Sequence, residues 1–439
     1  MKPDRLCGTV RRIAAASLLL ACVGTAQDLA PDGLLVRIKS HMHAELSHLP
    51  DYTCLETMSR FRRDRHSQVR SHELLTALDT VRLEIVYSDH REWFGSPGDR
   101  DLRVNDPAAF IGGGMIGNGA FGLMLDKIFA EASFTYRGEE SLGGRTAVRY
   151  DFRLSRLQKP LELSVPGGAG TVGEEGSLWA DPQSLDLIRM ESRADEIPPY
   201  LPVEDESTDV DYARTRIGGN NALLAQQAGS HLLDAYGVEN YNRIEFTHCR
   251  AYSTQSELRF DVEPSGPPGA SPAGSPPAAS SRDAVGRAVP AFLPIAVSLT
   301  TPISDGDAVG TLIEARVLDD VLHKGKIVVP KGSVVHGRIR RLERFKQGIF
   351  IVGLEFTEVE VGGDLLPFYA DFLRTDKNPR IQAQHSGRVL VPERSGIHVK
   401  EETITLPELP GVASFFVSGT TFTLPRGFHM VWRTRGPIR

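Results

Sequence analysis

Three side chains near the start of the chain have the types and spacing of a metal site. His41, Glu45 and His48 stand at positions i, i+4 and i+7, so on a helix they share one face, and zinc accepts imidazole and carboxylate ligands. They do not form the His-Glu-x-x-His motif of zinc hydrolases. The same face flanks the apolar stripe of the expected helix, where polar residues occur in any case. We therefore expect a solvated helix flank and no bound metal, and keep a metal-dependent hydrolase as an alternative.

A glycine-rich stretch, IGGGMIGNGAFG at 111–122, contains two overlapping G-x-G-x-x-G patterns. A dinucleotide-binding loop of this kind needs a buried strand before it and a helix after it. The preceding NDPAAF does not have the composition of a core strand, so we expect no nucleotide and no other cofactor. We interpret the stretch as a loop at the mouth of a cavity, formed by Gly112, Gly113, Gly114, Gly117 and Gly119.

The segment IVVPKGSVVHG, residues 327–337, places Lys331, Gly332 and Ser333 between two β-branched runs. In a phosphate-binding loop the lysine follows the glycine and a helix follows the loop, whereas here Lys331 precedes Gly332 and the next run is strand-like. We predict the turn of a hairpin. The sequence also has no G-x-S-x-G elbow, no reactive Cys-His context and no C-x-x-C pair. We therefore assign no catalytic residue and expect a protein that is not an enzyme.

A concentration of basic side chains follows this turn. The whole chain has a formal net charge of −6, which argues against a nucleic-acid partner. Residues 283–439 carry 20 basic and 17 acidic side chains, so the preceding part is the acidic one. The basic cluster either is solvated, faces that acidic part or an acidic partner, or meets lipid headgroups or lipopolysaccharide. It comprises Arg338, Arg340, Arg341, Arg344 and Lys346.

The first 26 residues have the three parts of a secretory signal peptide: a basic start, an apolar stretch at 13–20 and the small residues 24–26. The apolar part is too short to span a bilayer. Leu19-Leu20-Ala21-Cys22 is also similar to a lipobox, so a lipid-modified Cys22 is an alternative. We expect the mature protein in the periplasm or at the periplasmic face of the outer membrane.

Export affects the interpretation of the cysteines. After cleavage at residue 26 only Cys54 and Cys249 remain, and two cysteines in an oxidising compartment most simply form one disulfide. Two buried free thiols are the alternative.

Residues 264–281 consist only of proline, serine, glycine and alanine. Such a composition buries no core and is typical of an extended linker. We place the linker at 263–289, an N-terminal domain at 30–262 and a C-terminal domain at 290–439.

The N-terminal segment begins with helical periodicity at about 32–48 and again shows it at 122–131, while alternating patterns at 81–88 and 148–155 predict half-buried strands. GSLWADPQSLDLIRMES at 176–192 predicts a strand, an Asp-Pro turn and a second strand. These patterns predict an α+β domain.

The order of the initial helix, YTCLETMSRF, GRTAVRYDF and GSLWADPQSLDLIRMES resembles the LolA/LolB-type periplasmic lipoprotein carriers. The resemblance implies an antiparallel half-barrel packed around helices, with a concave face that holds acyl chains.

The C-terminal segment consists of short alternating runs separated by turn signals, which favours an all-β fold, a small barrel or a sandwich. The alternation slips near Thr357-Glu358, which predicts a bulge, and Gly362-Gly363 then predicts a turn. The block at 293–361, above all VVPKGSVVHG, together with the late TFTLPRGFHMVW, resembles the TrbI-type β-barrel core of conjugal-transfer and type IV secretion proteins. The glycine-rich helical hairpin and the inner-membrane anchor of that family are absent from the sequence, so the resemblance extends to the barrel and not to a pore.

Together these features predict an exported, non-catalytic cell-envelope protein. A lipid, a lipoprotein acyl chain or an apolar segment would bind in the half-barrel, and the C-terminal barrel would dock to an envelope assembly. A structural scaffold subunit of a secretion-type complex, self-associating through the C-terminal domain, is the alternative.

Overall fold

The computed structural model describes residues 31–64, 76–88, 91–98, 121–157, 161–165, 168–252, 289–345, 348–375, 381–383, 387–392, 399–404 and 411–436. The expected signal peptide with Cys22, the glycine loop 112–119, linker residues 263–288 and Lys346 lie outside the described residues. Among the helices within those ranges, none has the length and apolar character needed to cross a membrane.

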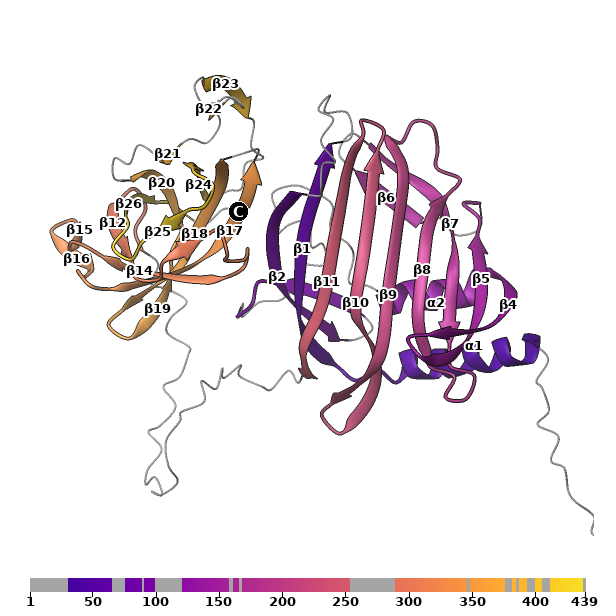
Figure 1. The fold of residues 1–439 in the computed structure, drawn as a ribbon. Coiled ribbons are helices and arrows are strands. Elements are labelled where there is room, and N and C mark those ends of the chain that lie inside the picture. Colours follow the sequence, from indigo (N-terminus) through magenta and orange to yellow (C-terminus); the bar gives the residue numbers. More distant parts are fainter. Residues whose placement is uncertain are drawn as a thin grey trace, which may run out of the picture.

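The first half of the described chain forms one antiparallel sheet of eleven strands that curls into a half-barrel (Figure 1). Short β6 (Leu161–Val165) pairs only with β7. The order of the other strands is β3 (Arg91–Gly95), β2 (Thr76–Ser88), β1 (Tyr52–Asp64), β11 (Val238–Ala251), β10 (Asn220–Asp234), β9 (Val203–Ile217), β8 (Leu187–Asp195), β7 (Gly168–Ala180), β5 (Arg145–Leu154) and β4 (Ser133–Leu142).

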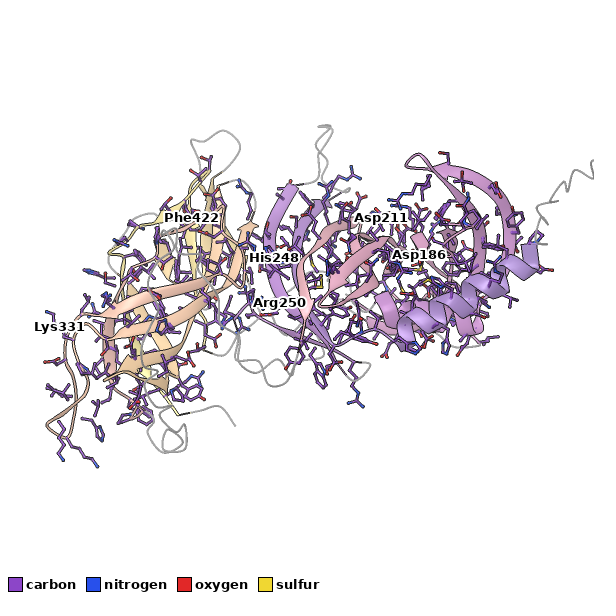
Figure 2. All side chains as sticks on the ribbon, turned by 90° about the horizontal axis from the view of Figure 1, so that it is seen from below. Asp186, Asp211, His248, Arg250, Lys331 and Phe422 are labelled. Atoms are coloured by element: carbon purple, nitrogen blue, oxygen red, sulfur yellow. A yellow bond between two sulfur atoms is a disulfide. The ribbon has the colours of Figure 1, made fainter. Side chains whose placement is uncertain are left out.

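Two helices lie against one face of this sheet (Figures 1 and 2). Helix α1 (Pro31–Ser47) buries Leu34, Ile38 and Met42, which recur every four residues and so form one stripe. Helix α2 (Phe121–Glu131) buries Leu125 and Ile128. On the sheet, alternate residues face the helices; in β5 these are Val148, Tyr150, Phe152 and Leu154, all at most 3% exposed. The predicted helices, the alternating strands and the Asp-Pro turn between β7 and β8 are confirmed, and the helix-facing side of the sheet is the hydrophobic core.

The second half of the described chain contains strands and no helix within those residues, which confirms the all-β prediction. A nine-stranded antiparallel sheet has the order β20 (Ala370–Thr375), β26 (His429–Thr434), β12 (Pro294–Leu299), β14 (Leu312–Val317), β17 (Val334–Phe345), β18 (Ile349–Val361), β24 (Ala413–Ser418), β21 (Ile381–Ala383), with β19 (Asp364–Pro367) on β18. Three ribbons complete it: β13 (Ile303–Ser304) with β25 (Thr423–Leu424), β15 (Val321–His323) with β16 (Lys326–Val329), and β22 (Gly387–Pro392) with β23 (Val399–Ile404).

Aromatic side chains from distant strands of this second sheet meet at Trp432, which is fully buried. Phe356 packs edge-on against its ring at 5.2 Å between centroids, and Phe372 does so at 5.6 Å. Strands β18, β20 and β26 therefore curl around one apolar core.

Three turn predictions can be compared with this sheet. The pairing of β17 with β18 skips Thr357, which is the predicted bulge, and Gly362 and Gly363, both at positive φ, form the turn into β19. The turn at 330–333 is also present, because the amide of Ser333 donates to the carbonyl of Pro330 and Gly332 has φ +85°. The predicted hairpin across it is wrong: β16 pairs with β15, and β17 pairs with β14 and β18.

The two sheets meet through backbone hydrogen bonds at the edge of β2. The amide of Arg82 donates to the carbonyl of Val309, and the amide of Val309 donates to the carbonyl of Thr80, both over 2.8 Å. The amide of the next residue, Gly310, donates to the carbonyl of Ile339 on β17. The segment between β13 and β14 thus extends the first sheet by one bridge.

Buried charges lie beside this junction. Arg60 donates to both carboxylate oxygens of Asp79, over 2.6 and 2.5 Å, and both side chains are at most 2% exposed. On β17, the side chain of Arg341 is 1% exposed and lies 3.2 Å from Glu343. The charges of Arg60 and Arg341 influence each other, so the second sheet presents Arg341 toward the first.

The basic cluster is therefore not one exposed patch, and the expectation of a headgroup-facing or solvated surface is wrong for its buried members. Arg338 and Arg341 are 7% and 2% exposed. Arg340 donates to Glu355 over 2.5 Å, and Arg344 lies over the ring of Phe350. The strands direct these side chains into ion pairs and packing that the sequence spacing does not reveal.

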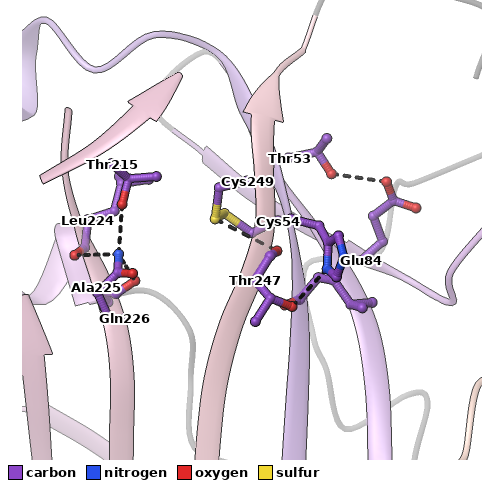
Figure 3. The surroundings of a disulfide bond; sticks show 11 residues. Thr53, Cys54, Glu84, Thr215, Leu224, Ala225, Gln226, Thr247 and Cys249 are labelled. Carbon is purple, nitrogen blue, oxygen red and sulfur yellow. Dashed lines mark hydrogen bonds between the residues drawn. A yellow bond between two sulfur atoms is a disulfide. The ribbon is translucent and has the colours of Figure 1, made fainter. Parts of the chain in front are cut away.

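Cys54 on β1 and Cys249 on β11 form the predicted disulfide across 195 residues (Figure 3), so the alternative of two free thiols is wrong. A bulge makes this pairing fit: the register shifts between Thr53 and Leu55, and His248 takes φ +53°. Cys54 is 4% exposed and packs with Ile217, Ala222 and Leu224. The bond joins two neighbouring strands at the concave face.

Replacing both cysteines by alanine should lower the free energy of unfolding by about 3–5 kcal/mol, because the bond closes a long loop in the unfolded chain. Denaturant unfolding with and without dithiothreitol measures this. The reductant should lower the midpoint of the wild type and leave the double variant unchanged. Equal wild-type midpoints under both conditions would contradict the assignment.

Candidate apolar binding site

A narrow, mainly apolar pocket lies where the helices meet the concave face of the first sheet. Met42 and Leu46 of α1 and Leu125 of α2 form one side, and Leu223 and Phe246 of the sheet form the other. The open volume is about 40 Å³, which is little more than that of one water molecule. A larger apolar ligand would therefore require α1 to move away from the sheet.

Polar side chains interrupt this apolar wall. Glu92 of β3 and Tyr212 of β9 both line the pocket, and Tyr52 of β1 stacks on Tyr87 of β2 with 5.3 Å between ring centroids. The register places Glu92 opposite Tyr87 and Tyr87 opposite Tyr52, so these three residues form a row across the sheet on its concave side.

A second carboxyl group, that of Glu56, lies on the same face of β1 as Tyr52 and is 1% exposed. Its cross-strand neighbours are Leu83 and Phe246. In the part of the chain that the structure describes, Glu56 Oε1, Glu92 Oε2 and the Tyr212 hydroxyl are buried and have no hydrogen-bond partner. Buried polar atoms without partners are rare in folded proteins.

The surroundings of both carboxyls favour the protonated form. Burial raises the pKa of Glu56 to about 8. Burial, and then the charge of nearby Glu56, raise the pKa of Glu92 well above its usual value. Glu56 is therefore mainly neutral at pH 7, and the surroundings of Glu92 also favour its neutral form.

A polar latch connects α1 to the sheet beside this pocket. Arg214 of β9 donates to Glu45 of α1 over 2.8 Å and to Asp186 over 2.5 Å, and His41 of α1 lies 2.8 Å from Asp186. Burial alone would raise the pKa of Asp186, but hydrogen bonds from Arg214 and His41 outweigh it and lower that pKa. His48 instead contacts the carbonyl of Ala44.

The three candidate metal ligands therefore do not come together. His41 and Glu45 belong to the latch, His48 contacts the backbone of its own helix, and no group of metal-ligating side chains occurs within the described ranges.

A larger hollow of about 740 Å³ lies on the opposite, polar face of the sheet. Its charged side chains already pair with one another: Arg137 with Asp151, and Arg189 with Glu191 and Asp209. Opposite charges alternate across neighbouring strands there, so the charges of this hollow neutralise one another. We therefore place the candidate binding site on the helix side of the sheet.

The residues of this site differ from those that sequence patterns highlighted. In YTCLETMSRF, Glu56 alternates with Cys54 and Met58, so all three lie on the same face of the strand. A charged residue among buried apolar ones indicates a special role, and we missed this signal in the sequence. Tyr212 and Arg214 gave no local signal, since their neighbours come from distant strands. Glu92 lies opposite Tyr87 of the adjoining strand, and we assigned it no role from the sequence.

No protein-family model matches the sequence, and no curated protein matches it. Solved structures with similar folds include a domain assigned to outer membrane lipoprotein sorting from Vibrio parahaemolyticus, at 11% identity, covering 51% of this chain and 94% of that one, with TM-score 0.30. A LolA superfamily protein from Nitrosomonas europaea matches at 9% identity, 50% and 94% coverage, and TM-score 0.24. ComB10 of the Com type IV secretion system of Helicobacter pylori matches at 13% identity, 34% and 87% coverage, and TM-score 0.18. Their names agree with the two resemblances suggested by the sequence patterns, a LolA-type carrier and a type IV secretion protein.

The variant Glu56→Gln should be more stable than the wild type at pH 7 and above. Glu56 titrates near 4.5 when unfolded and near 8 when folded, so the folded state holds a proton that the unfolded state has lost, and raising the pH between these values destabilises the protein. The difference at pH 7 should be roughly 3 kcal/mol and should vanish below pH 4.5.

Denaturant unfolding at pH 4, 7 and 9 measures this difference. Glu139→Gln on the exposed strand β4 serves as the control and should follow the wild type. A constant gap between Glu56→Gln and the wild type across this range would show that Glu56 is not the titrating group.

Proposed function

We propose that this protein is an exported, non-catalytic envelope protein whose first sheet binds an acyl chain or another extended apolar segment beneath α1. The pocket between the two helices and the concave face carries the proposal, because it is mainly apolar and because polar contacts hold α1, its main cover, in place.

The energetics favour opening. Burial of each methylene group contributes about 0.8 kcal/mol, so a chain that buries ten of them gains roughly 8 kcal/mol. The latch consists of ion pairs among side chains that are 18–30% exposed, and such pairs contribute up to about 1 kcal/mol each. A bound chain can therefore offset the loss of the latch and of the burial of Met42, which contributes about 1.5–3 kcal/mol.

The second sheet has a separate role in this proposal. We take 30–262 and 290–439 as two domains joined by the linker at 263–289, preceded by a signal peptide. The second domain docks to envelope partners, and its bridge to β2 holds it beside the binding domain. The lipid-modified form at Cys22 fits the same location at the outer membrane.

Replacing Ala225 by tryptophan should fill the pocket, since Ala225 lines it from β10. We expect the affinity for the apolar probe N-phenyl-1-naphthylamine to fall at least tenfold, and lipid that co-purifies with the wild type in native mass spectrometry to be lost. Leu157→Trp, at a side chain that is 88% exposed, is the control. Unchanged probe binding by a folded Ala225→Trp variant would exclude this pocket.

Replacing Arg214 by glutamine should speed ligand binding, because it removes the ion pairs with Glu45 and Asp186 that hold α1 closed. The association rate of the probe in stopped-flow fluorescence should rise several-fold, since the open state becomes more populated. Arg216→Gln, on the same strand and exposed, should leave the rate unchanged. An unchanged rate for Arg214→Gln would argue against a latch.

A further inference from the structure

Strands β15 and β16 form a two-stranded ribbon that is separate from the nine-stranded sheet. His323 and Lys326 pair at its end, and Lys324 and Gly325 between them have φ values of +51° and +77°. Two successive residues at positive φ make the two-residue turn of a tight hairpin. The ribbon lies at the end of the second sheet that is farthest from the first sheet (Figure 1).

This ribbon exposes an apolar pair. Leu322 and Ile327 stand opposite each other in the register, so their side chains point to the same face, and they are 57% and 54% exposed. Val321 and Val329, at the base of the ribbon, are buried. Single exposed apolar side chains are ordinary on a protein surface, but here two of them oppose each other at the end of a projection. The core does not include this pair, so it is free to contact a partner.

The charges beside the apolar pair are positive. Lys324 and Lys326 are exposed at the turn, and residues 321–342 contain no acidic side chain. Asp319 and Asp320 precede the ribbon, and Asp320 accepts a backbone hydrogen bond at its base over 2.7 Å. Lysines on a free strand edge also prevent pairing with other chains, but an exposed leucine and isoleucine work against that purpose. The combination therefore indicates a partner that is both anionic and apolar.

The size and shape of the ribbon favour a lipid bilayer over a protein. The ribbon consists of residues 321–329, whereas a stable protein interface takes about 20–30 residues on each side. A narrow projection also offers little area to a rigid surface. A bilayer adapts to such a projection, because aliphatic side chains enter the boundary between headgroups and acyl chains while lysine ammonium groups stay among the phosphates.

The acidic part of the chain lies away from the ribbon. That part precedes residue 283, and the bridge between Val309 and β2 holds the first sheet on the opposite side of the second sheet. Repulsion between exposed charges is screened beyond about 8 Å at physiological ionic strength. The acidic first sheet therefore opposes contact between the ribbon and an anionic surface very little.

From this arrangement we propose that the β15–β16 ribbon docks the protein onto a membrane surface that contains anionic lipid. Leu322 and Ile327 enter the interface of the bilayer, and Lys324 and Lys326 bind the lipid phosphates. The proposal rests on the export and on the docking role of the second domain in the proposed function. It names the partner of that domain and does not involve the pocket beneath α1.

Co-sedimentation with lipid vesicles tests this docking on the chain from Gln27 onward, the mature form under the proposed export. Phosphatidylcholine vesicles with about a third of phosphatidylglycerol should bind the wild type about tenfold more tightly than pure phosphatidylcholine vesicles do, because the lysines are attracted to the anionic lipid. Salt at about 0.5 M should remove most of this difference.

Charge variants locate the contact. Lys324→Gln/Lys326→Gln should lose about tenfold or more in affinity for the anionic vesicles, since each lysine near such a surface contributes about fivefold. Arg374→Gln/Arg433→Gln, at two exposed arginines of β20 and β26, is the matched control and should bind like the wild type.

Apolar variants test insertion into the bilayer. Leu322→Ser/Ile327→Ser should bind the anionic vesicles about fivefold more weakly, because it removes the apolar surface that the bilayer buries. Leu365→Ser/Leu373→Ser, at two other exposed side chains of the second sheet, is the control. Brominated lipid should quench the added fluorescence of Ile327→Trp and not that of Leu373→Trp. All these side chains are exposed, so denaturant midpoints should match that of the wild type.

Absence of wild-type binding to the anionic vesicles, or equal binding by the wild type and both ribbon variants, would overturn the proposal. Dependence on the lysines alone, without quenching of Ile327→Trp, would also overturn it and indicate an acidic protein surface. Dependence on Leu322 and Ile327 alone would overturn the selection of anionic lipid. The affinity for N-phenyl-1-naphthylamine in lipid-free solution reports on the pocket beneath α1 separately, so the docking proposal can fail while the proposed apolar binding stands.

Discussion

The whole first sheet depends on the burial of its concave face under α1. An open half-barrel exposes an apolar surface along its inner side, and in the described chain two helices cover it. The stripe of Leu34, Ile38 and Met42 is buried between α1 and the sheet. Burial of each of these side chains stabilises the fold by roughly 1.5–3 kcal/mol. Toward the end of α1, however, the contact leaves a small pocket, and polar contacts from Arg214 hold the helix there. The apolar stripe stabilises the packing of α1 on the sheet, and the latch marks the end of α1 that can move away from it.

Glu56 and Glu92 oppose this stability. Each takes a carboxyl group out of water without a basic partner, and burial favours the protonated, uncharged form of both carboxyl groups. Natural proteins keep such groups mainly where function requires them. The row of Glu92, Tyr87 and Tyr52 crosses three strands, so the polar groups stand on paired strands and not on loops. A ligand would therefore find their positions already set.

Local patterns predicted much of this fold. The helical periodicity at 32–48 matches α1 within one residue at each end, and the slip at Thr357 and the Gly362-Gly363 turn are both present. These features depend on near neighbours in the chain. The disulfide followed from the expected compartment and not from spacing. The pairing of β16 was predicted wrongly because two alternating strands flanking a turn do not reveal which third strand each prefers. The site itself was missed for the same reason: Arg214 meets Glu45 across 169 residues, and no window of sequence contains both.

The two edges of the half-barrel show how the open sheet avoids pairing with other chains. An exposed edge strand is a template for aggregation. On one side, β3 covers part of β2, and the bridge to Val309 occupies the stretch around Thr80 and Arg82. On the other side, β4 is exposed along most of its length, and features of its own sequence must prevent it from pairing with another chain. Its pairing with β5 shifts between Tyr136 and Gly138, which twists the edge, and Arg137, Glu139 and Glu140 place charges along it. The segment between β13 and β14 thus covers the part of β2 that β3 leaves free, and charge with a bulge protects β4.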